Sequence, residues 1–295
     1  MKMHILTIVR DDLQGLQRTI NSIKSQICSS VEISVLVIDG FSEVSPESIV
    51  NNSSHVDFTF IRRQPAGIYN AMNEGLKELA STCDIDSCSV VFLNAGDFFV
   101  DALAVEKLCR ANMVSKISVG KAVMLNQASY PLVMQPEITL GSGEEYMHPV
   151  VYWFPHQGLS ATFEVYQKVG YFNEKFKIAG DYDWISRAVQ AFGEPRIIPD
   201  YLVAQMTDGV SNKRSYSGYR ERRALANQLN FPLRRLPRLL VIKMYIKEIV
   251  HRRLSYFVKQ SKKRFNKAIY PHDHLANDIC AWCLHDQFSV NTSNA

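Results

Sequence analysis

The sequence lacks the long apolar run that a membrane-spanning helix requires. No window approaches about 20 consecutive apolar residues without charge. The apolar run Ile5–Val9 is too short, and wrongly flanked, for a secretory signal. Cysteine is scarce, with 6 in 295 residues, and without a secretory signal we expect reduced thiols rather than a disulfide framework. These absences predict a cytoplasmic protein.

Three nucleotide-binding or catalytic motifs are also missing. The sequence contains neither G-x-G-x-x-G, which marks a dinucleotide site, nor G-x-x-x-x-G-K-[ST], which marks a P-loop. It has no G-x-S-x-G, so a nucleophile elbow is unsupported. Any bound phosphate is therefore not held by a glycine-rich loop. Carboxylates that follow the predicted strands favour a metal bridge to the phosphate instead.

Acidic residues are nearly missing from one region. Residues 212–267 hold 17 Lys and Arg against only Glu221 and Glu248, so this segment carries a net charge of +15. The rest of the chain has 16 Lys and Arg and 27 Asp and Glu, a net charge of −11. Such a division predicts a polyanionic partner. Because no nucleic-acid motif accompanies the charge, we expect an anionic membrane surface and no nucleic acid.

In the first hundred residues, short apolar runs alternate with stretches that have helical periodicity. Strands covered on both faces are continuous runs of Val, Ile and Leu, so the pattern predicts a mostly parallel sheet wrapped by helices. The 46% of hydrophobic residues suffices for a full core. The predicted strands are Ile5–Val9, Ile33–Ile38, Val90–Leu93 and, later, Tyr201–Gln205, and the predicted helices are Leu13–Gln26 and Ile68–Ser81.

Polar residues follow the predicted strands directly. Ligands of such α/β sheets bind beyond the carboxyl ends of the strands. Asp39 follows the second run, and Asn94 and Asp97 follow the third. From the residues alone, each Asp could equally be a turn residue beside its glycine.

Six strings in order resemble the family 2 glycosyltransferases, which have the GT-A fold, a Rossmann-like nucleotide-sugar-binding α/β fold. The likeness covers roughly residues 3–225 and is most similar to the bacterial exopolysaccharide and O-antigen enzymes, in particular the colanic-acid type. The strings are Val37–Ser42, Gly67–Gly75, Phe92–Asp97, His156–Gln157, Ala179–Asp183 and Gly209–Ser211.

The resemblance implies roles for residues near a nucleotide-sugar donor. Asp97 matches the last carboxylate of the metal-binding D-x-D element, which holds Mn²⁺ or Mg²⁺ against the donor diphosphate, while Asn94 stands at its first position. Asp39 matches the residue that contacts uracil or ribose. The remaining matched residues, expected to shape the nucleotide pocket, are Gly67, Asn70 and Asn73.

The resemblance also assigns the chemistry to Asp181, as the base that removes a proton from the acceptor hydroxyl. An alternative is that Asp181 only caps a helix over residues 182–192. Asp183 would be a supporting or acceptor-binding group. Matched residues on the acceptor side are His156, Gln157 and Ser211. Trp153 and Trp184 could stack on sugars, although burial in the core is commoner for aromatic residues.

The sequence departs from the family pattern near the donor. Pro65 stands where an acidic residue is usual, Asn70 where Asp is usual, and Asp208 where a second Gly is usual. These departures bear on the donor sugar. Pro65, Asn70 and Asn94 also suggest an alternative, a non-catalytic protein with this fold that binds the membrane surface.

The resulting expectation is an inverting, metal-dependent transferase. It would move a hexose from a UDP-linked donor to a lipid-linked or growing saccharide in bacterial surface polysaccharide synthesis. Residues 1–228 would form the catalytic domain, with a nucleotide-sugar half (1–100) and an acceptor half (101–228), followed by a basic helical extension and tail (229–295).

The basic extension carries a more specific prediction. In residues 231–267, leucine and isoleucine recur at near-helical spacing beside arginine and lysine, which predicts an interfacial helix on the inner face of the cytoplasmic membrane. The alternative is a stripe that packs on the catalytic domain. The tail holds residues with a spacing that zinc could use, although packing is the commoner fate: His272, His274, Cys280, Cys283 and His285.

Overall fold

The computed structural model describes residues 1–50, 56–81, 88–126, 129–134, 137–138, 152–153, 155–206, 215–229, 237–250 and 253. The chain divides into two units, Met1–Glu248 and Ile249–Ala295. Only three residues of the second unit are among those described, so the architecture that follows is that of the first unit.

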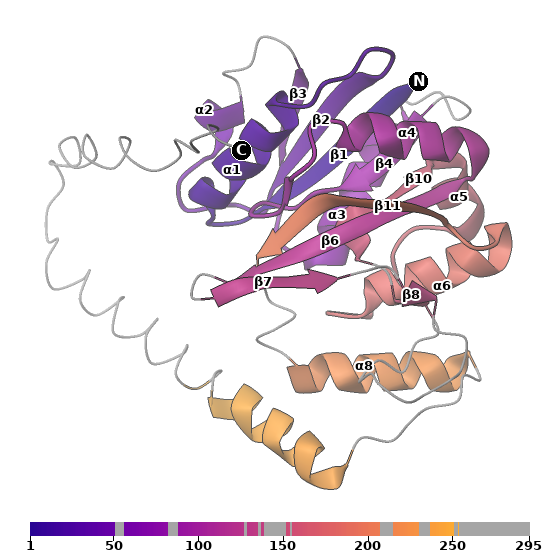
Figure 1. The fold of residues 1–295 in the computed structure, drawn as a ribbon. Coiled ribbons are helices and arrows are strands. Elements are labelled where there is room, and N and C mark those ends of the chain that lie inside the picture. Colours follow the sequence, from indigo (N-terminus) through magenta and orange to yellow (C-terminus); the bar gives the residue numbers. More distant parts are fainter. Residues whose placement is uncertain are drawn as a thin grey trace, which may run out of the picture. The chain divides into compact units, whose positions relative to one another are not determined.

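A mixed sheet forms the centre of this unit (Figure 1). Its strand order is β3-β2-β1-β4-β10-β6-β11-β5, with β7 paired to β6. Strands β3, β2, β1 and β4 are parallel neighbours, whereas β10 runs antiparallel to both β4 and β6. The bounds are β1 (Lys2–Val9), β2 (Glu32–Asp39), β3 (Asp57–Arg62), β4 (Cys88–Phe92), β5 (Phe98–Phe99), β6 (Ile117–Asn126), β7 (Ser129–Met134), β10 (Leu159–Thr162) and β11 (Arg196–Met206). A separate small sheet pairs β8 (Glu137–Ile138) with β9 (Tyr152–Trp153).

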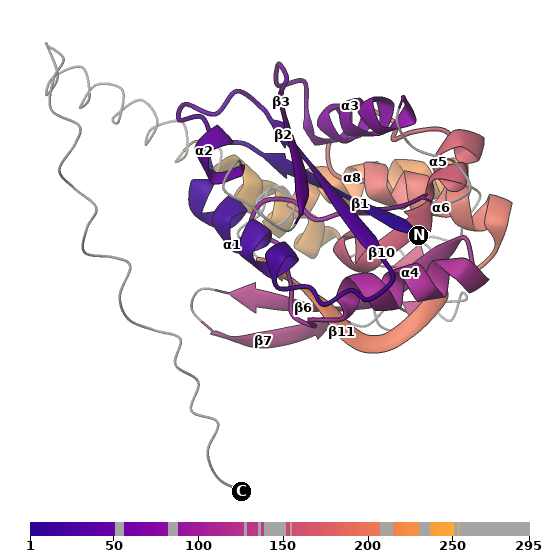
Figure 2. The same ribbon diagram turned by 90° about the horizontal axis from the view of Figure 1, so that it is seen from above.

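Helices cover both faces of the sheet. The helices are α1 (Leu13–Lys24), α2 (Glu47–Val50), α3 (Ile68–Ala80), α4 (Ala104–Val114), α5 (Phe163–Val169), α6 (Gly180–Phe192) and α8 (Ser215–Gln228). Figure 2 shows α3, α5 and α6 on one side of the strands and α1 and α4 on the other. Because successive side chains of a strand point to opposite faces, Leu6 packs with Leu76 and Trp184 in one core, and Ile5 packs with Ile20 in the other.

The predicted α/β fold with a mostly parallel sheet is confirmed, and every strand and helix expected from the apolar pattern is present. The edge strand β3 was not expected. Exposed and half-buried residues alternate over its first four positions, and none of its six residues is fully buried. The sequence DFTFIR therefore lacks the continuous apolar run of the inner strands.

The expectation of reduced thiols is only partly right. Cys28 and Cys109 are free, but Cys88, at the start of β4, is disulfide-bonded. A disulfide requires two Cβ atoms about 4 Å apart, a distance that folding sets and that spacing along the chain does not reveal.

The C-terminal region is helical where it is described. Helix α8 is followed by a second helical stretch over residues 238–250. Residues 230–236 lie outside the described residues, so the predicted boundary after residue 228 stays a prediction. Among the described residues, no helix is both long and apolar enough to cross a membrane.

Candidate active site

Three parallel strands end side by side and bring the predicted donor residues to one edge. Strand β1 lies between β2 and β4, so the carboxyl ends of these strands meet. Asp39 is the last residue of β2, and the turn Asn94–Asp97 follows β4. The structure therefore gathers the residues that strand order predicted for the ligand crevice.

Asp39 is fully buried and has several polar partners at this edge. Its Oδ2 lies 2.8 Å from Nε of Arg62, and its Oδ1 accepts from the backbone N–H and the hydroxyl of Ser42, at 3.0 and 2.5 Å. The Ser42 hydroxyl oxygen accepts in turn from the N–H of Asp11, at 2.8 Å. Asp11 and Phe41 both adopt left-handed backbone conformations, with φ of 54° and 57°. The Asp39 carboxylate thus joins the ends of β1 and β2 and is neutralised by Arg62.

The turn after β4 brings Asn94 and Asp97 together through a backbone hydrogen bond. Asp97 is 7% exposed, and its N–H donates to the carbonyl of Asn94 at 2.9 Å. Gly96 has φ of 98°, a conformation that favours glycine. Thr19 of α1 fixes the turn, since its hydroxyl donates to the Asp97 carbonyl at 2.7 Å and accepts from the Gly96 N–H at 3.1 Å.

The side chains of this turn fit a hard divalent cation. Oδ1 of Asn94 is buried and has no hydrogen-bond partner among the described residues, and it lies in the same turn as the Asp97 carboxylate. Mg²⁺ and Mn²⁺ prefer such oxygen donors and commonly keep few protein ligands, with phosphate oxygens and water completing the shell. No cluster of three or more His, Cys, Asp or Glu suited to a metal occurs in the described part of the chain.

Asp181 lies in the first turn of α6 and is held by two other elements. Its Oδ1 accepts from the Tyr69 hydroxyl at 3.1 Å, and its Oδ2 lies 3.3 Å from Nδ1 of His156. Oδ1 also accepts from the N–H of Tyr182 at 3.0 Å. The helix begins at Gly180, with Ala179 as its N-cap, so the alternative reading of Asp181 as the cap is wrong.

Tyr69 approaches Asp181 because Gly180 leaves room for its ring. A Cβ at Gly180 would lie 2.8 Å from two ring carbons of Tyr69. Burial, and next the negative charge of Asp181, raise the pKa of Tyr69 well above its usual value of 10. The hydroxyl therefore keeps its single proton, which it shares between the carbonyl of Ile178 at 2.7 Å and Oδ1 of Asp181 at 3.1 Å.

His156 links the two carboxylates electrostatically. Burial lowers the pKa of His156, but the hydrogen bond to Asp181 and the charges of Asp181 and Asp97 outweigh burial, so the pKa lies above the usual 6.5. A larger fraction of His156 is therefore cationic near neutral pH. Beside it lies a small cavity of about 20 Å³, room for one water, whose lining includes His156, Asp181, Met72 and Trp184.

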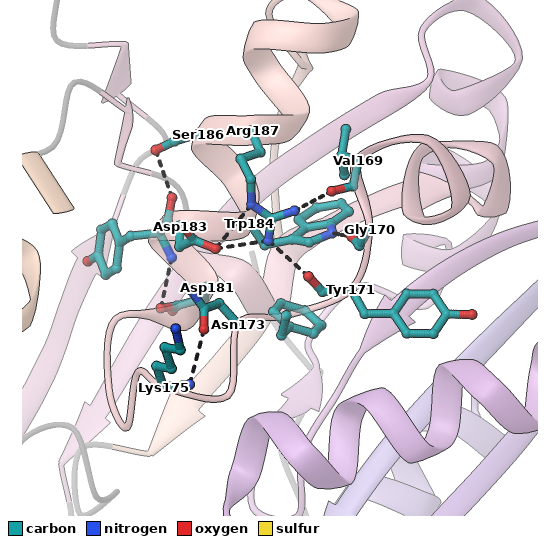
Figure 3. Close-up of polar contacts among 12 residues, drawn as sticks. Val169, Gly170, Tyr171, Asn173, Lys175, Asp181, Asp183, Trp184, Ser186 and Arg187 are labelled. Carbon is teal, nitrogen blue, oxygen red and sulfur yellow. Dashed lines mark hydrogen bonds and ion pairs between the residues drawn. The ribbon is translucent and has the colours of Figure 1, made fainter. Parts of the chain in front are cut away.

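The Asp183 carboxylate points away from Asp181 and toward the guanidinium of Arg187 (Figure 3). Its Oδ2 accepts from Nη2 and Nε of Arg187, at 2.8 and 3.1 Å. The same guanidinium donates to the carbonyls of Val169 and Tyr171, the latter at 2.9 Å. Asp183 is buried and supports this loop, so its predicted role as a supporting group matches its contacts, and an acceptor contact stays a prediction.

The predicted nucleotide-pocket residues of α3 contact the loop before α6. The Asn73 amide donates to the Phe172 carbonyl and to Glu174, both at 2.9 Å, and accepts from the Phe172 N–H. Asn70 donates to the other Glu174 oxygen at 3.1 Å. Gly67 caps α3 with φ of 115°. The structure thus gives Asn73 a positioning role, and a donor contact of any of the three stays a prediction.

The other predicted residues are Gln157, Ser211, Trp153 and Trp184. Gln157 is buried in the 3₁₀ helix η1 (His156–Gly158), and Ser211 lies outside the described residues, as does the tail with its predicted zinc ligands. Trp184 is a core residue, because it is buried, stacks on Tyr166 at 4.3 Å between ring centroids and donates to the Gly170 carbonyl. No side-chain contact of Trp153 is described.

Three residues of the site were not predicted from the sequence. Tyr69 lies inside the string Gly67–Gly75, where its aromatic character suggests core. Arg62 lies on the unpredicted strand β3. Glu221 accepts hydrogen bonds from the segment before α6, and the scarcity of acids in the basic region was the signal that could have found it.

The sequence has known relatives, although no family model matches it. Two proteins of Mycobacterium tuberculosis, one from each of two strains and each named an uncharacterized glycosyltransferase, are 29% identical to it over 223 residues. The alignment covers 72% of this chain and 78% of theirs.

Solved structures share the fold. S. aureus TarS in complex with UDP-GlcNAc has a TM-score of 0.59 and 15% identity, with 85% of this chain and 72% of that chain covered. The mannosyltransferase PcManGT of Pyrobaculum calidifontis, in complex with GDP-Man and Mn²⁺, has a TM-score of 0.52 and 14% identity, with 83% and 68% covered. The sequence similarity and the shared fold together support a glycosyltransferase.

Proposed function

We propose that the protein is an inverting glycosyltransferase, which transfers a hexose from a UDP-linked donor to a saccharide acceptor with Asp181 as the base. One observation carries the proposal. The Asp181 carboxylate is held by donors from two other elements, and the charges of Asp181 and Asp97 both act on His156. This arrangement supports placing a base and a phosphate-side carboxylate in one site.

Counting lone pairs identifies the oxygen of Asp181 that would take the proton. A carboxylate oxygen has two lone pairs. Oδ1 already accepts from the Tyr182 N–H and from the Tyr69 hydroxyl, whose proton it shares with the Ile178 carbonyl, whereas Oδ2 has only the contact to His156. Oδ2 is thus the acceptor for the proton of the attacking hydroxyl. Tyr69 and His156 keep the carboxylate oriented while the proton moves.

A single base suffices for this reaction. In glycoside hydrolysis two carboxyl groups are needed, because the leaving alkoxide must be protonated. Here the leaving group is a nucleoside diphosphate, which departs as an anion. The engagement of Asp183 with Arg187 is consistent with one base rather than two.

A divalent cation fits the turn after β4. Asp97 and Asn94 would hold Mn²⁺ or Mg²⁺, and the bound ion supplies charge neutralisation of the diphosphate. The presence of Mn²⁺ with GDP-Man in the mannosyltransferase of similar fold supports this choice.

The donor nucleotide is proposed to bind at the edge formed by β1, β2 and β4. Asp39 ends β2 there, and Phe41 beside it is 45% exposed, with the Arg62 guanidinium 4.9 Å from its ring centroid. Structures of TarS with UDP and UDP-GlcNAc share this fold, which supports a UDP-linked donor.

We place the acceptor on a lipid at the inner face of the cytoplasmic membrane, in surface polysaccharide synthesis. Support comes from the helical residues 238–250, where Leu239, Ile242 and Ile246 are 65%, 51% and 54% exposed, on the side of a helix that also carries Lys243 and Lys247. Apolar residues between cations are typical of an interfacial helix. The same helix contacts α8 through Tyr245 and Glu248, but these three apolar side chains are left exposed.

The test replaces Asp181 by asparagine, which has nearly the same shape but cannot act as the base. With Mn²⁺, thermal-shift measurements on UDP-glucose, UDP-galactose and UDP-GlcNAc first identify the donor, since a ligand of the native state raises the melting temperature. Release of UDP from that donor should then fall at least ~10²-fold in Asp181→Asn, because a general base contributes about 10²–10⁴. The affinity of Asp181→Asn for UDP should stay within about 2-fold of the wild-type affinity.

Wild-type turnover in Asp181→Asn would refute the assignment. Absence of turnover in the wild type, with UDP still bound, would favour the non-catalytic membrane-binding alternative.

A further inference from the structure

Glu221 of α8 binds the backbone that leads into α6. Its carboxylate accepts from three consecutive N–H groups, those of Lys177 at 3.0 Å, Ile178 at 2.8 Å and Ala179 at 2.9 Å. Helix α6 begins at the next residue, Gly180, and Asp181 follows. The contact therefore lies two residues before the proposed base.

This contact supplies what the local sequence does not. Backbone N–H groups at the start of a helix lack partners within the helix. Glu221 accepts from one of them, the N–H of the N-cap residue Ala179, whose own side chain has no hydrogen-bonding atom. A carboxylate suits the position, since hydrogen bonds to an ionised acceptor are stronger than neutral ones and the helix dipole favours negative charge there.

The same segment is also fixed from its other side. The Tyr69 hydroxyl donates to the Ile178 carbonyl at 2.7 Å, while Glu221 accepts from the Ile178 N–H. Tyr69 contacts Asp181 directly. On the far side of Asp181, the guanidinium of Arg222 lies 5.7 Å from the ring centroid of Tyr182. Helix α8 thus contacts the chain before and after the proposed base.

Helix α8 is itself held by the other acid of the basic region. Glu248, 4% exposed, accepts from the N–H of Ser217 at 2.9 Å and from its hydroxyl at 2.5 Å, in the first turn of α8. Residues 212–267 contain only these two acids against 17 Lys and Arg. Glu221 binds three backbone N–H groups directly before α6 and Glu248 binds one in the first turn of α8, so neither serves merely to balance charge.

We propose that Glu221 is a positioning residue for Asp181. It fixes the segment 177–179 so that the first turn of α6 holds Oδ2 of Asp181 in line for proton transfer. This inference rests on the proposed role of Asp181. A displacement of about 1 Å at a reacting group can cost ~10²-fold in rate, so loss of Glu221 should lower turnover without weakening nucleotide binding.

The test compares Glu221→Gln and Glu221→Ala in the full chain. UDP release from the preferred UDP-hexose is measured per folded molecule, well below each melting temperature, and UDP affinity is measured by calorimetry with Mn²⁺. We expect kcat to fall about 10-fold or more in Glu221→Ala and less in Glu221→Gln, which retains one carbonyl acceptor, with the Kd for UDP within about 2-fold. Glu194→Gln, an exposed change of the same kind beyond the other end of α6, should behave as wild type.

Measurements in the Asp181→Asn variant distinguish the positioning role of Glu221 from the proposed role of Asp181 as the base. Because Glu221 acts through Asp181, Glu221→Ala should change the residual rate of Asp181→Asn less than about 2-fold. Wild-type kcat per folded molecule in the Glu221 variants, with an inactive Asp181→Asn, would overturn the inference alone. Full activity of Asp181→Asn would overturn the proposed function. Should Glu221→Ala fail to fold, Glu221→Gln still decides, since a purely structural role would lower its melting temperature and leave kcat unchanged.

Discussion

At the scale of single residues, the site pairs two carboxylates that have different surroundings. Asp181 is held by donors from α3 and η1, whereas Asp97 lies in a turn with a buried amide oxygen. These donors orient the carboxylate that is proposed as the base. The oxygen atoms around Asp97 favour a cation. We therefore assign proton removal to Asp181 and phosphate binding, through a bound cation, to Asp97.

Asp97→Ala should remove the effect of the metal on nucleotide binding. The divalent ion would lose its only proposed carboxylate ligand, so the Kd for UDP in Mn²⁺ should rise about 10-fold or more, toward the value without metal. Titration calorimetry with UDP at several Mn²⁺ concentrations measures this. Glu43→Ala, at an exposed site, is the matched control. An unchanged dependence on Mn²⁺ would make Asp97 a turn residue.

His4 should make the fold sensitive to acid. It is 5% exposed within β1, both ring nitrogens lack partners among the described residues, and burial lowers its pKa from 6.5 to about 4. The folded protein therefore binds fewer protons than the unfolded chain between these pH values, so stability is full above pH 6.5 and is lost as the pH falls toward 4.

His4→Val removes this loss and suits a strand. The difference in free energy of unfolding between variant and wild type should grow by about 2 kcal/mol from pH 7 to pH 4.5, in favour of the variant. Urea denaturation at the two pH values measures it. A difference independent of pH would contradict the assignment of an uncharged, buried His4.

At the scale of elements, the start of α6 depends on contacts from α3 and α8. Gly180 allows the Tyr69 ring to lie against the helix, where a Cβ would be 2.8 Å from ring carbons. Gly180→Ala should lower the free energy of unfolding by roughly 1–2 kcal/mol through overpacking, reduced somewhat by the better helix propensity of alanine. It should also lower turnover, because the ring must move away from Asp181.

Tyr69→Phe is the companion to this substitution. It keeps the ring but removes the hydroxyl, so it tests the hydrogen bond without the steric effect. Chemical denaturation and UDP release measured on both variants check the account. A Gly180→Ala variant with the stability and turnover of wild type would mean that the Tyr69 ring adapts freely.

The sequence predicted the elements that are covered on both faces, because their apolar runs reflect burial directly. It also located Asp39, Asn94 and Asp97 correctly, at strand ends that meet at one edge of the sheet. The partners of Asp181 were not predictable, since Tyr69 is 112 residues away along the chain and only packing brings the two together. Strand β3 was not predicted because it lacks a continuous apolar run. The disulfide at Cys88 was not predicted because it depends on a distance in space that the sequence does not reveal.

At the scale of the whole molecule, charge is divided between an acidic body and a basic C-terminal region. Each Lys or Arg near an anionic surface contributes about 1 kcal/mol, and salt screens this attraction. The protein should float with phosphatidylglycerol vesicles, not with phosphatidylcholine vesicles, and high salt should release it. The triple substitution Leu239→Asp, Ile242→Asp and Ile246→Asp should abolish flotation.

A matched control is Val114→Asp, at a position of α4 that is 73% exposed, which should float as wild type. Flotation of the triple variant at wild-type level would exclude residues 238–250 as the membrane contact. In that case the exposed apolar side chains would need another explanation.

The stereochemistry of transfer tests the central claim most directly. A single base and a single displacement predict that a hexose leaves an α-linked UDP donor with inverted configuration. Proton NMR of the sugar released to water, recorded before the anomers equilibrate, should show the β-anomer first, with its rate of appearance reduced at least ~10²-fold in Asp181→Asn. Initial release of the α-anomer would contradict inversion, and with it the role assigned to Asp181.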